Sequence, residues 1–155
     1  MLMNPNWSES LESRIVLRET PSCEAVFEGF LKYFYTGKIT FDFATVIPIL
    51  SLADKYNVKD LLEIGLSYMR RNVSNACRRN QVVSWYQFAS GAGHADVAAL
   101  VAAHIRANFE TVSENVDFSN CELDTLLFFA DANDLVMPSE MTFFRYKQIR
   151  FPVDI

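Results

Sequence analysis

Two stretches in the first half of the chain decide its fold: FLKYFYTGKI at residues 30–39 and LADKYNV at residues 52–58. The first belongs to a run of apolar side chains at helical spacing that starts after Pro21, because positions i, i+3 and i+4 share one helix face. Glycine is typical of the position just after a helix, so Gly37 predicts the end of this one. The second stretch predicts another helix end, where Asn57 breaks the apolar pattern.

The apolar pattern is helical along most of the rest of the chain. Further helices are predicted over residues 45–56, 58–71, 82–89, 97–109, 123–130 and 141–146. The β-branched segment RIVLR at residues 14–18 is the best candidate strand, and residues 39–43 are a short extended piece or a turn. Residues 72–80 and 110–120 are polar, and the first of these tracts predicts a boundary between two halves. The sequence therefore predicts a mainly α protein with one or two strands near its start.

Both stretches that open this section resemble segments of BTB/POZ domains. FLKYFYTGKI is similar to the LLxFIYTG segment of that family, and LADKYNV is similar to its AAdKYxv helix end. The order and spacing of the two segments, and the helix between them, also fit the family. The residues that carry the resemblance are Tyr35, Thr36, Gly37, Ala53, Asp54, Lys55 and Tyr56.

The second half resembles the BACK domain that often follows a BTB/POZ domain. The segments VSWYQFA at 83–89 and IRANF at 105–109 are similar to its "A…L…C…FI..NF" pattern. DLVMPSE at 134–140 is similar to its "L-x-V-x-s-E" step into the next helix. Within the superfamily, Trp85-Tyr86 and the CxxVF segment at 23–27 resemble the branch that holds BTB/POZ domain-containing protein 17 and galectin-3-binding protein.

This resemblance implies a two-part chain in which both parts are incomplete. Residues 1–72 would be the C-terminal part of an α/β BTB/POZ domain, without its N-terminal strands and helices and much of the usual homodimer interface. Residues 73–155 would be an incomplete α-helical BACK domain. The IRFP segment at 149–152 is similar to a step found later in BACK domains, so Tyr146-Lys147 is interpreted as a join across missing sequence.

The composition excludes several classes of function. Fourteen Lys and Arg against 19 Asp and Glu give a net charge of −5, which disfavours a nucleic-acid backbone as partner. The chain has no run of about 18 apolar residues, so no membrane span is predicted. Phosphate-loop, nucleophile-elbow and zinc-protease motifs are absent from the sequence, and the chain is therefore not predicted to be an enzyme.

Cysteine and histidine are too scarce and too widely spaced for a metal site or a catalytic pair. Cys23, Cys77 and Cys121 lie in or beside apolar segments and are predicted to be small buried apolar residues. His94 and His104 have no carboxylate at ligand spacing. No cofactor is predicted. The paired arginines at 70–71 and 78–79 are interpreted as a solvated helix end and a loop rather than a phosphate site.

The resemblance implies a non-catalytic adaptor that homodimerises in the full-length protein and links a substrate to a cullin-3 ubiquitin ligase. Cullin-binding BTB proteins carry a hydrophobic-x-Glu triplet in the loop that Trp7-Ser8-Glu9 matches here, so Trp7 and Glu9 are the candidate contact residues. An exposed Trp that anchors a loose terminus is an equal alternative. A second interpretation is a secreted oligomeric scaffold similar to galectin-3-binding protein, which would suit the glycosylation sequons at Asn6 and Asn72. The compartment, cytoplasmic or secreted, stays open.

Overall fold

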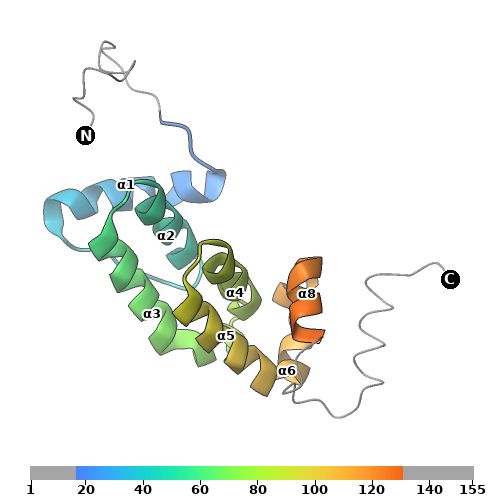
Figure 1. Cartoon of the computed structure of the whole chain (residues 1–155). Coiled ribbons are helices and arrows are strands. Elements are labelled where there is room, and N and C mark those ends of the chain that lie inside the picture. Colours follow the sequence, from blue (N-terminus) through green and yellow to red (C-terminus); the bar gives the residue numbers. More distant parts are fainter. Residues whose placement is uncertain (1–16, 131–155) are drawn as a thin grey trace.

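The computed structural model describes residues 17–130, and this range is helical without any strand (Figure 1). The helices are α1 (Pro21–Thr36), α2 (Val46–Lys55), α3 (Lys59–Arg78), α4 (Val82–Gly91), α5 (Ala95–Ala107), α6 (Phe109–Ser113), α7 (Val116–Ser119) and α8 (Leu123–Ala130). The predicted mainly α class is confirmed. The predicted helix over 141–146 and most of the candidate strand at 14–18 lie outside the described residues.

Helix α1 begins and ends where its sequence predicts. Pro21 occupies the first helical position, where its fixed φ suits the helix and its missing N–H costs nothing. Gly37 follows the last turn with a left-handed φ of 63°, and its N–H donates to the Tyr33 carbonyl oxygen at 2.8 Å. The helix buries Cys23 and Phe30 against α2.

Two polar tracts of the sequence are helical in the structure. Helix α3 was predicted to end near Arg71, and this was wrong: it continues to Arg78. Its apolar face also continues, because Ala76 and Cys77 are buried and Val73 packs against the core. Residues 72–80 are rich in polar side chains because the other faces of this part of α3 are exposed to solvent. Residues 110–120 similarly contain most of α6 and all of α7, two helices that the sequence did not predict.

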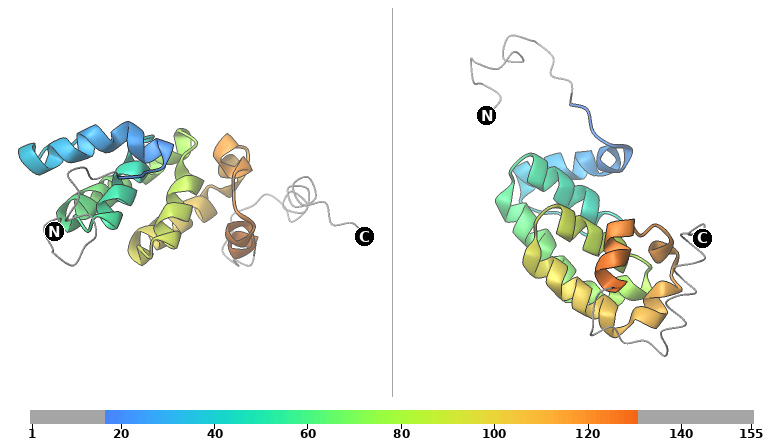
Figure 2. Two further views of the ribbon diagram at one scale, coloured as in Figure 1. Left: turned by 90° about the horizontal axis from the view of Figure 1, so that it is seen from above. Right: turned by 45° about the vertical axis from the view of Figure 1, so that its right-hand side comes forward.

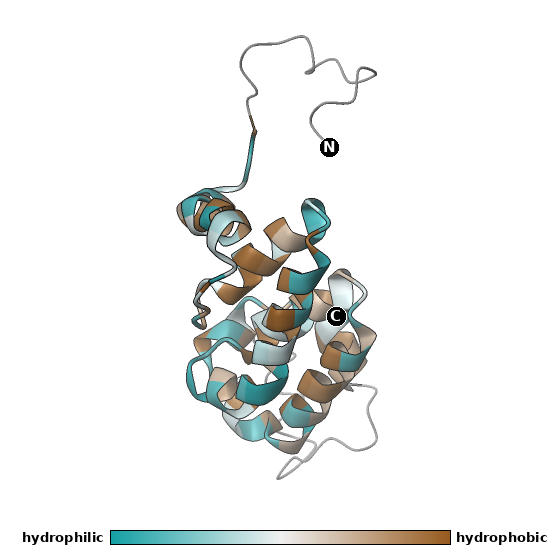
Figure 3. Cartoon of the chain, turned by 90° about the vertical axis from the view of Figure 1, so that its left-hand side faces the viewer, coloured by the Kyte–Doolittle hydropathy of each residue, from teal (hydrophilic) through white to brown (hydrophobic). Residues whose placement is uncertain are grey.

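The helices pack in sequence order, α1 on α2, α2 on α3, and α3 on α4 and α5, with α8 at the far end from α1 (Figures 1 and 2). A small core lies between α1, α2 and the start of α3. A larger core runs continuously from Val46 to Phe129, so it crosses the polar tract at 72–80. Hydrophobic and hydrophilic residues alternate along the helices, as expected for amphipathic helices around such a core (Figure 3).

Helices α2 and α3 approach so closely at Gly65 that a larger residue there would force a neighbouring side chain to move. A Cβ on Gly65 would collide with the side chain of Leu50 and lie 3.3 Å from the Phe41 ring. Leu50 is fully buried, so its side chain would have to shift within a packed core. Gly65 therefore fixes the α2–α3 spacing and, through Phe41, the course of the loop before α2.

A buried carboxylate in α7 holds the N-terminus of α4. Asp117, in α7, is 6% exposed, and its carboxylate accepts hydrogen bonds from the backbone N–H groups of Val83, at 2.6 Å, and Ser84. The Ser84 hydroxyl donates to the same carboxylate. These amides are among the first of α4 and have no partner within the helix, so Asp117 caps α4 from a distant point in the sequence.

An aromatic cluster joins the two halves of the chain. Trp85 of α4 is fully buried and stacks on Phe43, with ring centroids 5.7 Å apart. Tyr68 of α3 contacts both rings, with centroid distances of 6.2 Å to Trp85 and 6.0 Å to Phe43. The Arg79 guanidinium covers the outer face of Phe43 at 5.4 Å from its centroid. This cluster connects the loop before α2 to α3 and α4.

Candidate protein-interaction site

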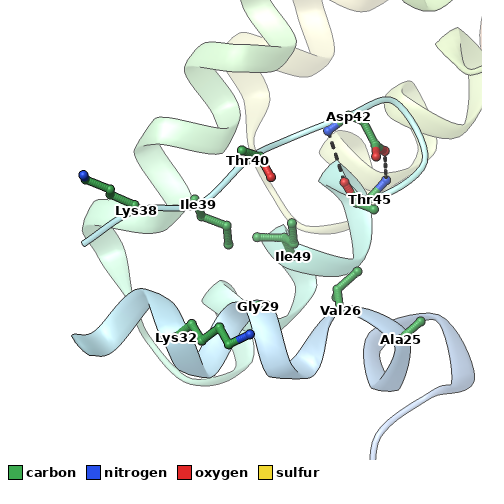
Figure 4. Close-up of a pocket in the computed structure, with 10 residues that line it drawn as sticks. All are labelled: Ala25, Val26, Gly29, Lys32, Lys38, Ile39, Thr40, Asp42, Thr45 and Ile49. Carbon is green, nitrogen blue, oxygen red and sulfur yellow. Dashed lines mark hydrogen bonds between the residues drawn. The ribbon is translucent and has the colours of Figure 1, made fainter. Parts of the chain in front are cut away.

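A groove of about 380 Å³ lies between α1 and the loop that leads into α2 (Figure 4). Ile39 of the loop and Ile49 of α2 point toward one another across its floor, and Lys32 and Lys38 lie at one end. Gly29 faces the groove from α1, and a Cβ there would meet nothing within 4 Å. The absence of a side chain at this position keeps the groove open along α1.

The far wall of the groove is held in place by Asp42. Its Oδ1 accepts hydrogen bonds from the backbone N–H groups of Ala44, at 2.8 Å, and Thr45, at 2.7 Å (Figure 4). The N–H of Asp42 in turn donates to Thr45 Oγ1 at 3.1 Å. Burial raises the pKa of Asp42, but the hydrogen bonds from Thr45 and Ala44 outweigh burial and hold the pKa below its usual value of 3.8. The ionised carboxylate therefore fixes the turn that starts α2.

Residues 38–42 form an extended segment with the side-chain alternation of a strand. Ile39 and Phe41 are half-buried, whereas Lys38, Thr40 and Asp42 are exposed. Among the described residues, no backbone group pairs with the N–H groups of residues 39–41. An extended segment with unpaired amides can accept another strand. The sequence predicts an extended piece or a turn at residues 39–43, and in the structure a segment without regular secondary structure reaches Asp42 and a turn begins at Phe43.

The C-terminal half of α1 exposes large apolar side chains, none of which lines this groove. Tyr35 is 90% exposed, Phe34 55% and Leu31 44%. Helix α1 packs mainly against α2, so its other faces are open in the described part of the chain (Figure 2). A gathering of large exposed apolar residues of this kind marks a surface for protein contact.

The residues of the two family motifs have different roles in the structure. Tyr35 is exposed, Thr36 Oγ1 donates to the Lys32 carbonyl oxygen at 2.8 Å, and Gly37 ends α1. Ala53 of α2 is fully buried in the core that α2 shares with α1 and the start of α3, and Asp54 is exposed. The remaining motif residues are Lys55 and Tyr56, at the end of α2.

Lys55 and Tyr56 hold the chain that precedes α1. Glu19, whose side chain is only 6% exposed, accepts a hydrogen bond from Lys55 Nζ at 2.8 Å and one from the Tyr56 hydroxyl at 2.5 Å. Lys55 Nζ also donates to the Arg18 carbonyl oxygen at 3.2 Å. The hydrogen bonds from Lys55 and Tyr56 lower the pKa of Glu19, and burial and then Glu19 raise the pKa of Tyr56 to about 12. The sequence pattern did not indicate Glu19, because its partners lie 36 and 37 residues away.

These pKa shifts predict how Glu19 and Tyr56 stabilise the fold as pH changes. Tyr56 contributes fully below its ordinary pKa of 10.0, and the contribution is lost as pH rises toward about 12. Glu19 contributes fully above its ordinary pKa of 4.5 and loses its contribution as pH falls through the lowered value. We therefore expect the difference in unfolding free energy between wild type and Tyr56→Phe to shrink between about pH 10 and pH 12.

Denaturant unfolding of both proteins across this range measures that difference, and the comparison cancels the titration of all other groups. Glu19→Gln provides the matched acid-side test, where the difference from wild type should shrink below about pH 4.5. A difference that stays constant across either window would show that the cluster is not formed.

Several other predicted residues can be placed. Cys23, Cys77 and Cys121 are buried, as predicted. Arg70 pairs with Glu63 and Asp96 at 2.8 and 2.6 Å, so it joins α3 to α5 rather than offering a phosphate site. In the described range, no three His, Cys, Asp or Glu side chains gather where a metal ion could bind. No helix of that range is long and apolar enough to cross a membrane.

The candidate cullin contact residues, Trp7 and Glu9, lie outside the described residues, as does the sequon at Asn6. The second sequon lies in the middle of α3, where Asn72 is half-buried and its Nδ2 donates to the Tyr68 carbonyl oxygen at 2.9 Å. Its amide nitrogen, the atom that would carry a glycan, is therefore engaged within the helix.

Comparison with known protein families agrees with these features. Residues 1–72 match the BTB/POZ domain, and residues 82–147 match BACK, described as "BTB And C-terminal Kelch". The chain therefore belongs to the BTB–BACK proteins, a family of generally non-catalytic protein-interaction modules.

Among individual proteins, the chain is similar to BTB/POZ domain-containing protein 17. It is 30% identical to the Xenopus laevis protein over 133 residues, and 29% identical to the mouse and human proteins over 135 residues. These alignments cover 86–87% of this chain but only 28% of the length of each relative. The resemblance to the branch that holds this protein is confirmed.

Proposed function

We infer that the chain is part of an adaptor or scaffold that acts by binding other proteins. The observation that carries this proposal is the succession of a BTB and a BACK domain in one chain. Two features of the structure support it: an exposed apolar surface on α1, where Phe34 and Tyr35 are more than half exposed, and an open groove along another face of that helix. A partner that supplies an extended segment could pair with the amides of residues 39–41 and place apolar side chains over Ile39. In the full-length protein a second copy would be one such partner.

The finer proposal is that the full-length protein links a substrate to cullin-3 through Trp7 and Glu9. The indole of Trp7 would enter an apolar pocket, and the Glu9 carboxylate would fix the register by a charge-assisted hydrogen bond. The described structure supports this proposal indirectly. Glu19, which follows Trp7 and Glu9 in the chain, is held against the end of α2 by its ion pair with Lys55.

A binding assay with the full-length protein tests this contact. Immobilised wild-type protein should capture cullin-3, and Glu9→Arg should weaken the affinity by at least roughly tenfold, since it reverses a charge at a buried hydrogen bond. Glu12→Arg is the matched control, with the same charge change in the same segment, and should bind like wild type. Equal binding by all three proteins would remove Glu9 from the proposal, and no binding even by wild type would favour the second candidate.

The second candidate is a secreted oligomeric scaffold similar to galectin-3-binding protein. The sequons favour it, although Asn72 is half-buried within α3 and is a poor acceptor unless that turn opens. A secretory signal peptide encoded upstream of residue 1 would support this candidate and make cullin recruitment irrelevant.

A further inference from the structure

The groove between α1 and the loop before α2 contains a glycine that the packing of the fold does not explain. Gly29 lies in the middle of α1, where glycine is less stable than alanine because it loses more backbone freedom on folding. A Cβ at Gly29 would meet nothing within 4 Å, so no close contact among residues 17–130 requires a glycine there. Gly65 differs, since a Cβ there would collide with Leu50. The glycine in α1 instead leaves space in the groove that it faces (Figure 4).

The opposite wall of the groove offers backbone groups for hydrogen bonding. Ile39 and Thr40 line this wall, and neither the N–H groups nor the carbonyl oxygens of residues 39–41 have a backbone partner within the described range. Such groups in an extended segment can pair with those of a second extended chain. A helix could not satisfy them, because its own backbone groups are bonded to each other. The groove is therefore suited to an extended chain.

The two ends of the groove carry opposite charges. Lys32 and Lys38 lie at one end, and Asp42 lies at the other (Figure 4). Lys32 Nζ pairs with Glu28 at 2.6 Å, but both side chains are largely exposed, so water screens this pair. Lys38 forms no ion pair among residues 17–130. An occupant of the groove should therefore place a carboxylate at the lysine end and none beside Asp42.

We propose that this groove binds an extended segment of another protein, with an aliphatic side chain followed two residues later by a carboxylate. The inference rests on the proposed function of the chain as a protein-binding module, and it specifies the chemistry of one partner. The segment runs antiparallel to residues 38–42, because antiparallel strand pairing is the more stable kind. Its aliphatic side chain lies over Ile39 and Ile49, opposite Gly29, and its carboxylate lies at the lysine end.

The dimensions of the groove agree with this spacing. Alternate residues of a strand point to the same side, and two residues of an extended chain cover roughly 6.6 Å. Gly29 and Lys32 are separated by roughly 4.5 Å along the axis of α1, and the long lysine side chain can bridge the remainder. A carboxylate two residues after the aliphatic side chain therefore reaches Lys32 from α1 and Lys38 from the loop.

Titration of the isotope-labelled complete chain with a synthetic peptide, followed by NMR, tests the proposal. The probe is the acetylated and amidated peptide Ser-Thr-Val-Thr-Glu-Thr-Ser. It should shift the amide signals of residues 39–41 and slow their hydrogen exchange, because these N–H groups become hydrogen-bonded. The same peptide with Lys in place of Glu should bind at least roughly tenfold more weakly, since it places a like charge beside Lys32 and Lys38.

Two variants separate the contribution of charge from that of shape. Lys38→Glu should weaken binding of the Glu peptide by roughly tenfold and should bind the Lys peptide more tightly than wild type does. Lys59→Glu is the matched control, because Lys59 is exposed on α3 outside the groove, and it should bind like wild type. Gly29→Leu should weaken binding of the Glu peptide by at least roughly tenfold without lowering the thermal denaturation midpoint, since its Cβ meets no neighbour and leucine favours a helix.

A probe that leaves the amide signals of residues 39–41 unshifted would overturn the proposal, as would a folded Gly29→Leu variant that binds the probe like wild type. Signals of residues 39–41 that change with protein concentration in the absence of peptide would also overturn it, since a second copy would then occupy the groove. Capture of cullin-3 by the full-length protein tests the proposed function separately, because that contact depends on Trp7 and Glu9. A protein that captures cullin-3 but does not bind the probe would keep the proposed function and lose only this inference.

Discussion

Replacing Asp117 with Ala should lower the free energy of unfolding by about 3 kcal/mol. The carboxylate is buried and accepts hydrogen bonds from the Val83 and Ser84 backbone N–H groups and from the Ser84 hydroxyl. The truncation leaves these donors buried without an acceptor, and it removes the negative charge from the N-terminus of α4. Because α7 and α4 are far apart in sequence, the loss also weakens the docking of α7.

Urea denaturation followed by far-UV circular dichroism measures this effect. Asp54→Asn is the matched control, because this carboxylate is exposed and forms no ion pair among residues 17–130, and it should change stability by less than about 0.5 kcal/mol. Asp117→Asn should fall between the two, since its amide oxygen can still accept one or two of the bonds. A variant Asp117→Ala as stable as the control would mean that α4 does not depend on this cap.

Most helix positions could be predicted from the sequence, because apolar spacing directly reports which face of a helix is buried. Helix α1 shows this clearly: Pro21 and Gly37 set its ends through local backbone preferences. The extension of α3 to Arg78 was missed, because only one narrow face of that tract is buried, by Ala76 and Cys77. Small buried residues give a weak periodic signal beside asparagines and arginines.

The interaction surface was harder to predict, because it depends on which apolar side chains stay exposed in the folded chain. The motif YTG was recognisable from the sequence. The sequence alone, however, gives no reason why Tyr35 is 90% exposed whereas Phe30, in the same helix, is buried. The same limit applies to Glu19 and Asp117, whose partners lie more than 30 residues away. Two polar residues at such distances meet only through the tertiary fold, and no local pattern indicates the pair.

The other large effect is expected at Trp85, where substitution by Ala should cost about 4 kcal/mol. Its side chain is fully buried between the rings of Phe43 and Tyr68, so truncation leaves a large cavity lined by aromatic groups. The site lies where the region matching BTB meets the region matching BACK, and it belongs to the core that runs from Val46 to Phe129. The destabilisation should therefore affect both regions at once.

This reasoning gives a sharp test of whether the two regions fold as one unit. The Trp85 indole Nε1 is buried and has no hydrogen-bond partner in the described structure, so Trp85→Phe sacrifices no hydrogen bond and should cost only about 1–2 kcal/mol. Hydrogen exchange on Trp85→Ala should show α2 and α5 losing protection together, since one continuous core links them. If α5 lost protection while α2 kept it, the aromatic cluster would be a contact between two independently stable domains. In that case the polar tract at 72–80 would be a boundary in stability, although α3 runs through it as an unbroken helix.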